Sequence, residues 1–182
     1  MADEQPMVYQ VKCPLHKDVD IRVSLYTEVQ NAPEIRKKIL EGTVQAALIK
    51  PALVVDLLQI LTAANKAICA HKNSKKITKT LHSEVLFCLS ASKNISESFK
   101  KYGIDDKDRS LVVVEVTEGE ASLGEDIKAM IKATQVPVSK LGELTDVQLV
   151  RKLYKVKDEE LASCTLSDSV VSRIACKDVL SV

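Results

Sequence analysis

The sequence predicts a single α+β domain, residues 1–182, in which a small mixed or antiparallel sheet packs against a layer of helices. The chain is 182 residues long, which suits one domain better than two. Its composition is globular, with 46% hydrophobic and 28% charged residues. Strand-like segments do not alternate regularly with long helices, so a doubly wound parallel sheet is not expected.

The first strands are predicted near the N-terminus. Ile21, Val23 and Leu25 alternate with polar residues over 20–26, the pattern of a strand with one buried face. A shorter strand at about 8–11 precedes it. Turn-forming residues separate the two segments, so we expect a hairpin.

Two helices are predicted after the hairpin. The first begins at Asn31, whose spacing to Glu34 is that of a capping box, and ends at Gly42. The second covers about 56–71, with Asp56 as its cap and apolar residues at helical spacing. The Leu-Ile-Lys-Pro segment between them is expected to be a junction, because a residue before proline avoids the helical conformation.

The second half of the chain is predicted to hold two more strands and further helices. The continuous apolar run 84–89 predicts a buried central strand. The β-branched segment 110–116 predicts another. Capping boxes and apolar spacing predict helices at about 94–102, 122–131, 145–154 and 159–177.

The composition argues against several classes of function. Aromatic residues make up 3% of the chain and Trp is absent, which argues against a base-stacking RNA platform. The five glycines form no phosphate-binding loop. A net charge of +1 argues against a uniformly basic nucleic-acid surface. We expect no signal peptide and no membrane-spanning segment, since the start is polar and no apolar run is long enough.

The cysteines could serve as nucleophiles, as metal ligands or as small core residues. Five cysteines without a CxxC pair are typical of free thiols in a reducing compartment. Cys69 lies close to His71 in the sequence, but a structural zinc site needs four ligands and no second pair is present. Burial in the core is the favoured interpretation of Cys69 and Cys88. A small Cys-dependent hydrolase stays open, because a nucleophile and its base meet only in the fold. No cofactor or metal is predicted.

Two segments are candidate binding surfaces. The first is a lysine cluster without intervening acidic residues, which either contacts phosphates or is a solvated connection. It consists of Lys72, Lys75, Lys76 and Lys79. The second is an apolar strip on the last helix, which either packs on the chain's own core or meets a partner. It consists of Leu166, Val170, Val171 and Ile174, continued by Val179, Leu180 and Val182.

Four segments together resemble a known family in their order and spacing. They are 31–42; 48–51 followed by 59–67; 84–90 followed by 94–104; and 173–180. No single motif among them is chemically diagnostic, but the combination is specific and spans nearly the whole chain. On these segments the chain resembles the Cgi family of PRPK-binding subunits of the KEOPS/EKC complex.

The resemblance implies an α+β protein without catalytic activity of its own. Members of the family bind the N-terminal lobe of PRPK, the complex's small atypical kinase/ATPase. Through it they associate with the threonylcarbamoyl transferase subunit and the other KEOPS subunits, which modify adenosine in the tRNA anticodon loop. Archaeal relatives also bind the 3′ CCA end of tRNA.

On this basis we expect a cytoplasmic and nuclear accessory subunit that supports the kinase and helps recruit tRNA, with no membrane partner. A kinase-binding regulator acting outside tRNA modification is the alternative. For the kinase interface we predict Val170, Val171, Arg173 and Ile174, an apolar strip with a charged rim. For tRNA phosphates we predict Lys72, Lys75, Lys76 and Lys79.

Overall fold

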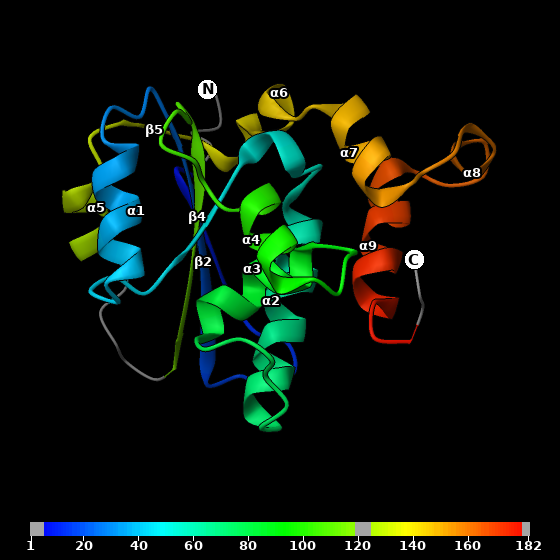
Figure 1. Ribbon diagram of the computed structural model, residues 1–182, viewed down its shortest axis with the longest axis horizontal. Coiled ribbons are helices and arrows are strands. Elements are labelled where there is room, and N and C mark those ends of the chain that lie inside the picture. Colours follow the sequence, from blue (N-terminus) through cyan, green and yellow to red (C-terminus); the bar gives the residue numbers. More distant parts are fainter. Residues whose placement is uncertain (1–5, 119–124, 180–182) are drawn as a thin grey trace.

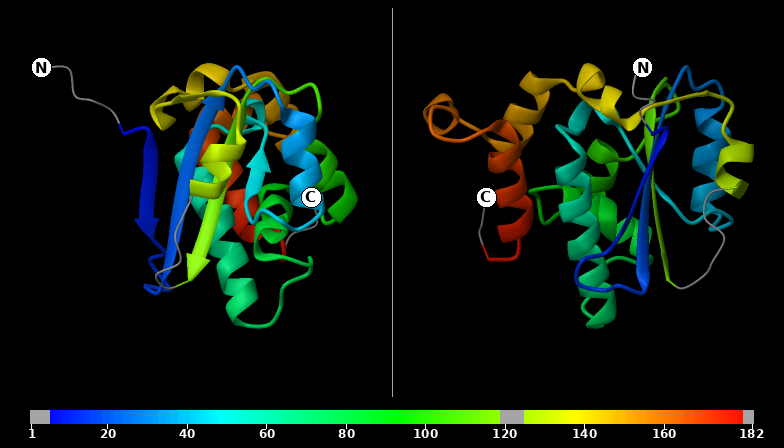
Figure 2. Two further views of the ribbon diagram at one scale, coloured as in Figure 1. Left: turned by 90° about the vertical axis from the view of Figure 1, so that its left-hand side faces the viewer. Right: turned by 180° about the vertical axis from the view of Figure 1, so that it is seen from behind.

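The computed structural model describes residues 6–118 and 125–179, which form one antiparallel sheet with helices around it. The strands are β1 (Val8–Lys12), β2 (Val19–Thr27), β3 (Ala47–Ile49), β4 (Leu111–Glu118) and β5 (Thr134–Val136). The sheet order is β1-β2-β4-β3, visible face-on in Figure 2 (left). Strand β4 pairs along one edge of β2. The other edge of β2 is shared by β1 and β5. The predicted fold class is confirmed.

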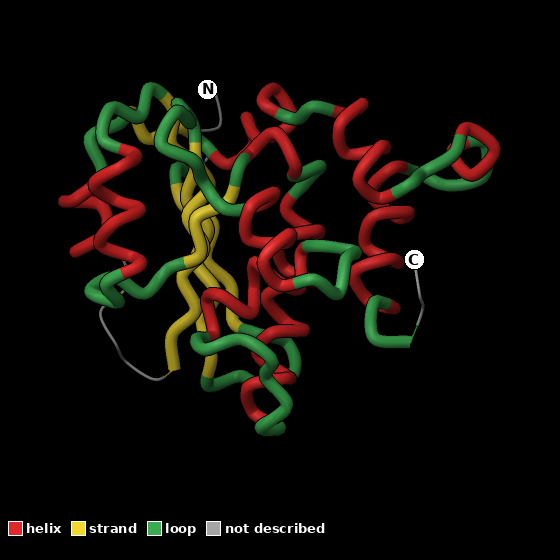
Figure 3. The backbone as a smooth tube through the Cα atoms, viewed as in Figure 1, coloured by secondary structure: helices red, strands yellow, loops and turns green. Residues whose placement is uncertain are grey.

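Helices cover both faces of the sheet. They are α1 (Ala32–Leu40), α2 (Leu57–Lys72), α3 (Leu81–Leu89), α4 (Ile95–Tyr102), α5 (Glu125–Met130), α6 (Leu141–Leu144), α7 (Val147–Tyr154), α8 (Asp158–Leu161) and α9 (Leu166–Cys176). Figures 1 and 3 show α1 and α5 on one face of the sheet and α2 and α3 on the other. Helix α9 packs on α2, on the side of α2 away from the sheet (Figure 1). The α1–α5 pair thus adds a second, smaller layer to the single layer predicted.

The two layers explain why β2 is more buried than a half-covered strand. Ile21, Val23 and Leu25 have no exposed surface and belong to the larger core cluster, shared with α2 and α3. Tyr26 points to the opposite face, where α1 and α5 form a second cluster, and it is also buried. In a strand covered on both faces, the side chains that point to either face are buried.

The largest difference from the predicted elements concerns 84–89, which is not a strand but the end of helix α3. This helix packs against α2, α4, β3 and β4, so apolar residues point from it in nearly every direction. A short apolar run does not distinguish a strand from a helix buried all round. The overlooked signal is Thr80, which forms a reciprocal capping box with Ser83 and starts the helix.

Other differences are local. The expected junction at 48–51 overlaps β3, whose three residues are too few to show a periodicity, and the start of a 3₁₀ turn at Pro51–Leu53. The last helical region is divided into α8 and α9. The Asn31 side chain does not cap α1; it donates to Met130 O (2.9 Å) and accepts from Lys132 N (3.0 Å), tying α1 to the end of α5. The capping box expected at Ser122 lies outside the described residues.

Candidate interaction surfaces

The structure places two of the four predicted kinase-contact residues in the chain's own core. Val170 and Ile174 have no exposed surface, because they lie on the side of α9 that packs against α2. Val171 and Arg173 are partly exposed. Of the two interpretations of the strip, core packing is therefore correct for Val170 and Ile174 in the free chain. Contact with a kinase stays a prediction for all four residues.

The C-terminal end of α9 is fixed by lysine side chains. Lys66 of α2 donates to the carbonyl oxygens of Ile174 (2.9 Å) and Ala175 (3.0 Å) in the last turn of the helix, where carbonyl groups run short of partners within the helix. Lys177 is buried, with its ammonium 3.2 Å from the centre of the Phe87 ring. Burial lowers the pKa of Lys177 to about 8. Lys66 thus ties the end of α9 to α2, and Lys177 ties it to α3.

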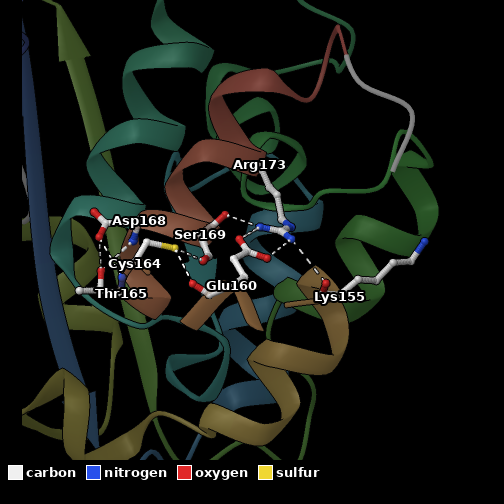
Figure 4. Close-up of polar contacts among 7 residues, drawn as sticks. All are labelled: Lys155, Glu160, Cys164, Thr165, Asp168, Ser169 and Arg173. Carbon is white, nitrogen blue, oxygen red and sulfur yellow. Dashed lines mark hydrogen bonds and ion pairs between the residues drawn. The ribbon is translucent and has the colours of Figure 1, made fainter. Parts of the chain in front are cut away.

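The Arg173 side chain is bound within the chain and is not a free charge at the edge of the apolar strip. Its guanidinium donates to both carboxylate oxygens of Glu160, at 2.6 and 2.8 Å, and to Ser169 O at 3.0 Å (Figure 4). The hydrogen bond from Arg173 is the main reason that the pKa of Glu160 is lowered to about 2. Arg173 thus holds the protruding α8 segment against α9.

A different set of apolar residues faces outward from α9. Val171, Ala175 and Val179 are spaced four residues apart, so they follow one side of the helix and the turn after it. Val171 is partly exposed, Ala175 is exposed, and Val179 is 83% exposed. We refer to these three residues as the α9 stripe. Leu180 and Val182, expected to continue the strip, lie outside the described residues.

The predicted phosphate-binding lysines lie at the end of α2 and in the loop 73–80 that follows, at the bottom of Figure 1. Lys72 is neutralised by two acids: its ammonium lies 2.8 Å from the Asp18 carboxylate and 3.1 Å from that of Glu118. The hydrogen bond to Asp18 is the main cause of its raised pKa. Lys75 and Lys79 are exposed. The loop therefore offers fewer available charges than the sequence suggested.

The fold brings together a second basic surface that the sequence does not mark. A shallow hollow of about 480 Å³ lies at the end of α7, and one of about 350 Å³ lies beside α4. Lys155 lines both, and the other lysines around them are Lys93, Lys101, Lys152 and Lys157. Two acids also line the hollows: Glu97 is paired with Lys101, and Asp158 with Arg151. These lysines come from two separate stretches of sequence, so no local charge run marks the surface.

The thiols give little support to a Cys-dependent hydrolase. Cys69 Sγ lies 3.7 Å from His16 Nε2, but burial raises the pKa of its thiol. Burial also raises the pKa of Cys88 to about 12. A nucleophilic cysteine needs the opposite shift. Among the described residues, no His, Cys, Asp and Glu side chains gather in threes to hold a metal, and no helix is long and apolar enough to cross a membrane.

Comparison with known proteins places the chain in a family. Residues 26–178 match the family model "Kinase binding protein CGI-121". The zebrafish (Danio rerio) protein "EKC/KEOPS complex subunit TPRKB" is 44% identical over 156 residues, 85% of this chain and 89% of its own length. Proteins named EKC/KEOPS complex subunit CGI121 are similar in Aspergillus fumigatus (31% identical over 81% of this chain and 85% of their own) and Yarrowia lipolytica (32% over 76% and 81%). The chain therefore belongs to the CGI-121 family.

Proposed function

We propose that this chain is a non-catalytic accessory subunit of a KEOPS/EKC complex in the cytoplasm and nucleus. In this role it binds the PRPK-type small kinase/ATPase, supports its activity, and helps recruit tRNA for threonylcarbamoylation of adenosine in the anticodon loop. The observation that carries the proposal is the match to a kinase-binding family over most of the chain, together with relatives named as subunits of that complex. The raised pKa values of Cys69 and Cys88 support an accessory role over thiol catalysis.

The kinase is proposed to contact α9, and different residues of the helix have different roles in this contact. Val170 and Ile174 anchor the helix to α2 from inside. Arg173 acts through its bond to Glu160, which keeps α8 beside the helix. The direct contact is then made by the α9 stripe, because apolar side chains that are already exposed cost little to transfer into an interface core.

The kinase contact is tested by charge substitution on the α9 stripe. The double variant Val171→Asp, Val179→Asp should fold normally, because neither side chain is part of the buried core, and should no longer co-purify with the kinase. It should also fail to stimulate the kinase's ATPase activity. Leu40→Asp is the matched control, since Leu40 is 78% exposed on α1, across the sheet from α9. Normal co-purification of the double variant would contradict the assignment.

The tRNA contact is proposed for the lysine loop, with Lys75, Lys76 and Lys79 as the main phosphate contacts and Lys72 as a lesser one. Replacing all four by Glu should weaken binding of an unmodified tRNA transcript and flatten its dependence on salt. Each lost phosphate contact reduces the slope of log K against log [salt] by about 0.7–0.9. The full chain is titrated by fluorescence anisotropy at several salt concentrations.

Two control variants, each with two Lys→Glu substitutions, accompany this measurement. Lys37→Glu, Lys38→Glu changes exposed lysines on α1 and should leave tRNA binding unchanged. Lys152→Glu, Lys155→Glu tests the second basic surface. If the lysine-loop variant retains the wild-type salt slope while the variant at the second surface has a reduced slope, the loop assignment is wrong. If none of them changes binding, a kinase-binding regulator outside tRNA modification becomes the supported function.

A further inference from the structure

The lysine loop is held by one buried carboxylate, Glu84 of α3. Its side chain is 2% exposed, and its Oε2 atom accepts three hydrogen bonds. The donors are the backbone N–H of Ile77 (3.2 Å), the backbone N–H of Thr78 (2.7 Å) and the Thr78 hydroxyl (2.6 Å). A carboxylate is costly to bury unless it is hydrogen-bonded, and these bonds come from the middle of the loop.

Further bonds around this carboxylate extend the fixed region. Ser83 Oγ donates to Thr78 Oγ1 at 3.0 Å, and the same Ser83 forms the capping box with Thr80. The loop is thereby fastened from Ile77 to Thr80 against the first turn of α3. Because the Ile77 backbone is turned inward to Glu84, its side chain points out and is 59% exposed. Lys79 lies within this fastened segment, and Lys75 and Lys76 lie directly before it.

We propose that Glu84 is a positioning residue, which fixes the lysine loop so that Lys75, Lys76 and Lys79 meet the phosphates of an RNA without first being ordered. This inference rests on the proposed tRNA contact. A flexible loop would lose conformational entropy on binding, whereas a loop already fixed does not. Glu84 itself is buried and touches no ligand; its own negative charge opposes the binding of RNA, so a positive effect of Glu84 on affinity must come from geometry.

The test separates geometry from charge and from general stability. Glu84→Ala removes the acceptor and should weaken binding of an unmodified tRNA transcript about five- to ten-fold, with an unchanged salt slope because the phosphate contacts are the same in number. Glu84→Gln should bind within about two-fold of wild type, because all three bonds go to one oxygen that Gln keeps. Amide hydrogen exchange of Ile77 and Thr78 should accelerate only in Glu84→Ala.

Two more variants complete the experiment. Asn94→Ala removes the cap of the neighbouring helix α4 and so destabilises the chain without touching the loop; it should bind tRNA normally. Thr78→Val removes the hydroxyl bonds of Thr78 to Glu84 and Ser83 but keeps both backbone bonds to Glu84. It should give a smaller loss than Glu84→Ala, which keeps the test valid if Glu84→Ala does not fold. Both are measured with the full chain and the same transcript.

The outcomes that overturn the inference are distinct. If Glu84→Ala and Thr78→Val bind like wild type while the lysine-loop variant loses binding, the tRNA contact stands and Glu84 has only a structural role. If Asn94→Ala weakens binding as much as Glu84→Ala, the effect is general destabilisation. If the lysine-loop variant binds normally, the proposed tRNA contact fails, and the role of Glu84 fails with it.

Discussion

Acidification is expected to destabilise the protein through one buried histidine, His82 in the first turn of α3. Its side chain is 7% exposed, and its Nε2 accepts the backbone N–H of Val116 in β4 at 3.2 Å. Only an unprotonated nitrogen can accept this bond. Burial lowers the pKa of His82 from 6.5 to about 4. The positive end of the helix dipole at the N-terminus of α3 also disfavours a charged ring there.

The sign and size of the effect follow from proton linkage. Between pH 6.5 and about 4 the unfolded chain binds a proton on His82 that the folded chain does not. The free energy of unfolding therefore falls as the pH falls through this window, by about 3 kcal/mol in total from this residue. Above pH 6.5 the ring is neutral in both states, and below pH 4 it is charged in both, so the contribution is constant outside the window.

The prediction is checked by urea unfolding at several pH values between 4 and 7.5. His82→Gln retains an acceptor for Val116 N–H but does not titrate, so its free energy of unfolding should fall by about 3 kcal/mol less than that of wild type over this range. His71→Gln, at the exposed end of α2, should follow the wild-type curve. Parallel curves for wild type and His82→Gln would refute the reasoning.

Three further predictions concern the core and the ion pair between Arg173 and Glu160 that holds α8 against α9. Ile174→Ala should lower the free energy of unfolding by about 2–5 kcal/mol, because it leaves a cavity between α9 and α2; a loss below about 0.5 kcal/mol in urea would show that α9 is not packed there. Tyr154→Phe should cost about 1–3 kcal/mol, since the buried Leu89 carbonyl loses its hydroxyl donor, and unchanged calorimetric stability would contradict this bond. Arg173→Met should return the pKa of Glu160 from about 2 towards 4.5, as followed by carbon NMR of the carboxyl group; a pKa that stays near 2 would mean that another donor is responsible.

The parts of the fold that could be predicted from sequence are those with a local physical cause. The alternation in β2 and the β-branched composition of β4 correctly predicted strands. Asp56 caps α2 through Gln59 N, as its position before an apolar helical pattern predicted. In each case the residues that determine the structure are neighbours in the sequence.

Features that depend on distant contacts could not be predicted. The run 84–89 is apolar in nearly every direction because α2, α4 and the sheet surround it, so its composition alone resembles that of a buried strand. The local signal of a helix is the capping box of Thr80, outside the run itself. Likewise, the charge of Lys72 is balanced by Asp18 and Glu118, which arrive from a turn and a strand end far away in the sequence. The periodicity of α9 identified an apolar side but could not say that α2 covers it.

The pairing of β2 has a consequence for synthesis of the chain. One edge of β2 is completed only by β4, which follows about ninety residues later. At a ribosomal rate of about 5–20 residues per second, the apolar strand waits roughly 5–20 seconds with that edge open. Open edges of this kind template aggregation. The yield of soluble chain should therefore depend on whether the open edge of β2 is protected until β4 has been synthesised. Expression at low temperature, which slows aggregation, or a chaperone bound to the nascent β1–β2 hairpin should raise that yield.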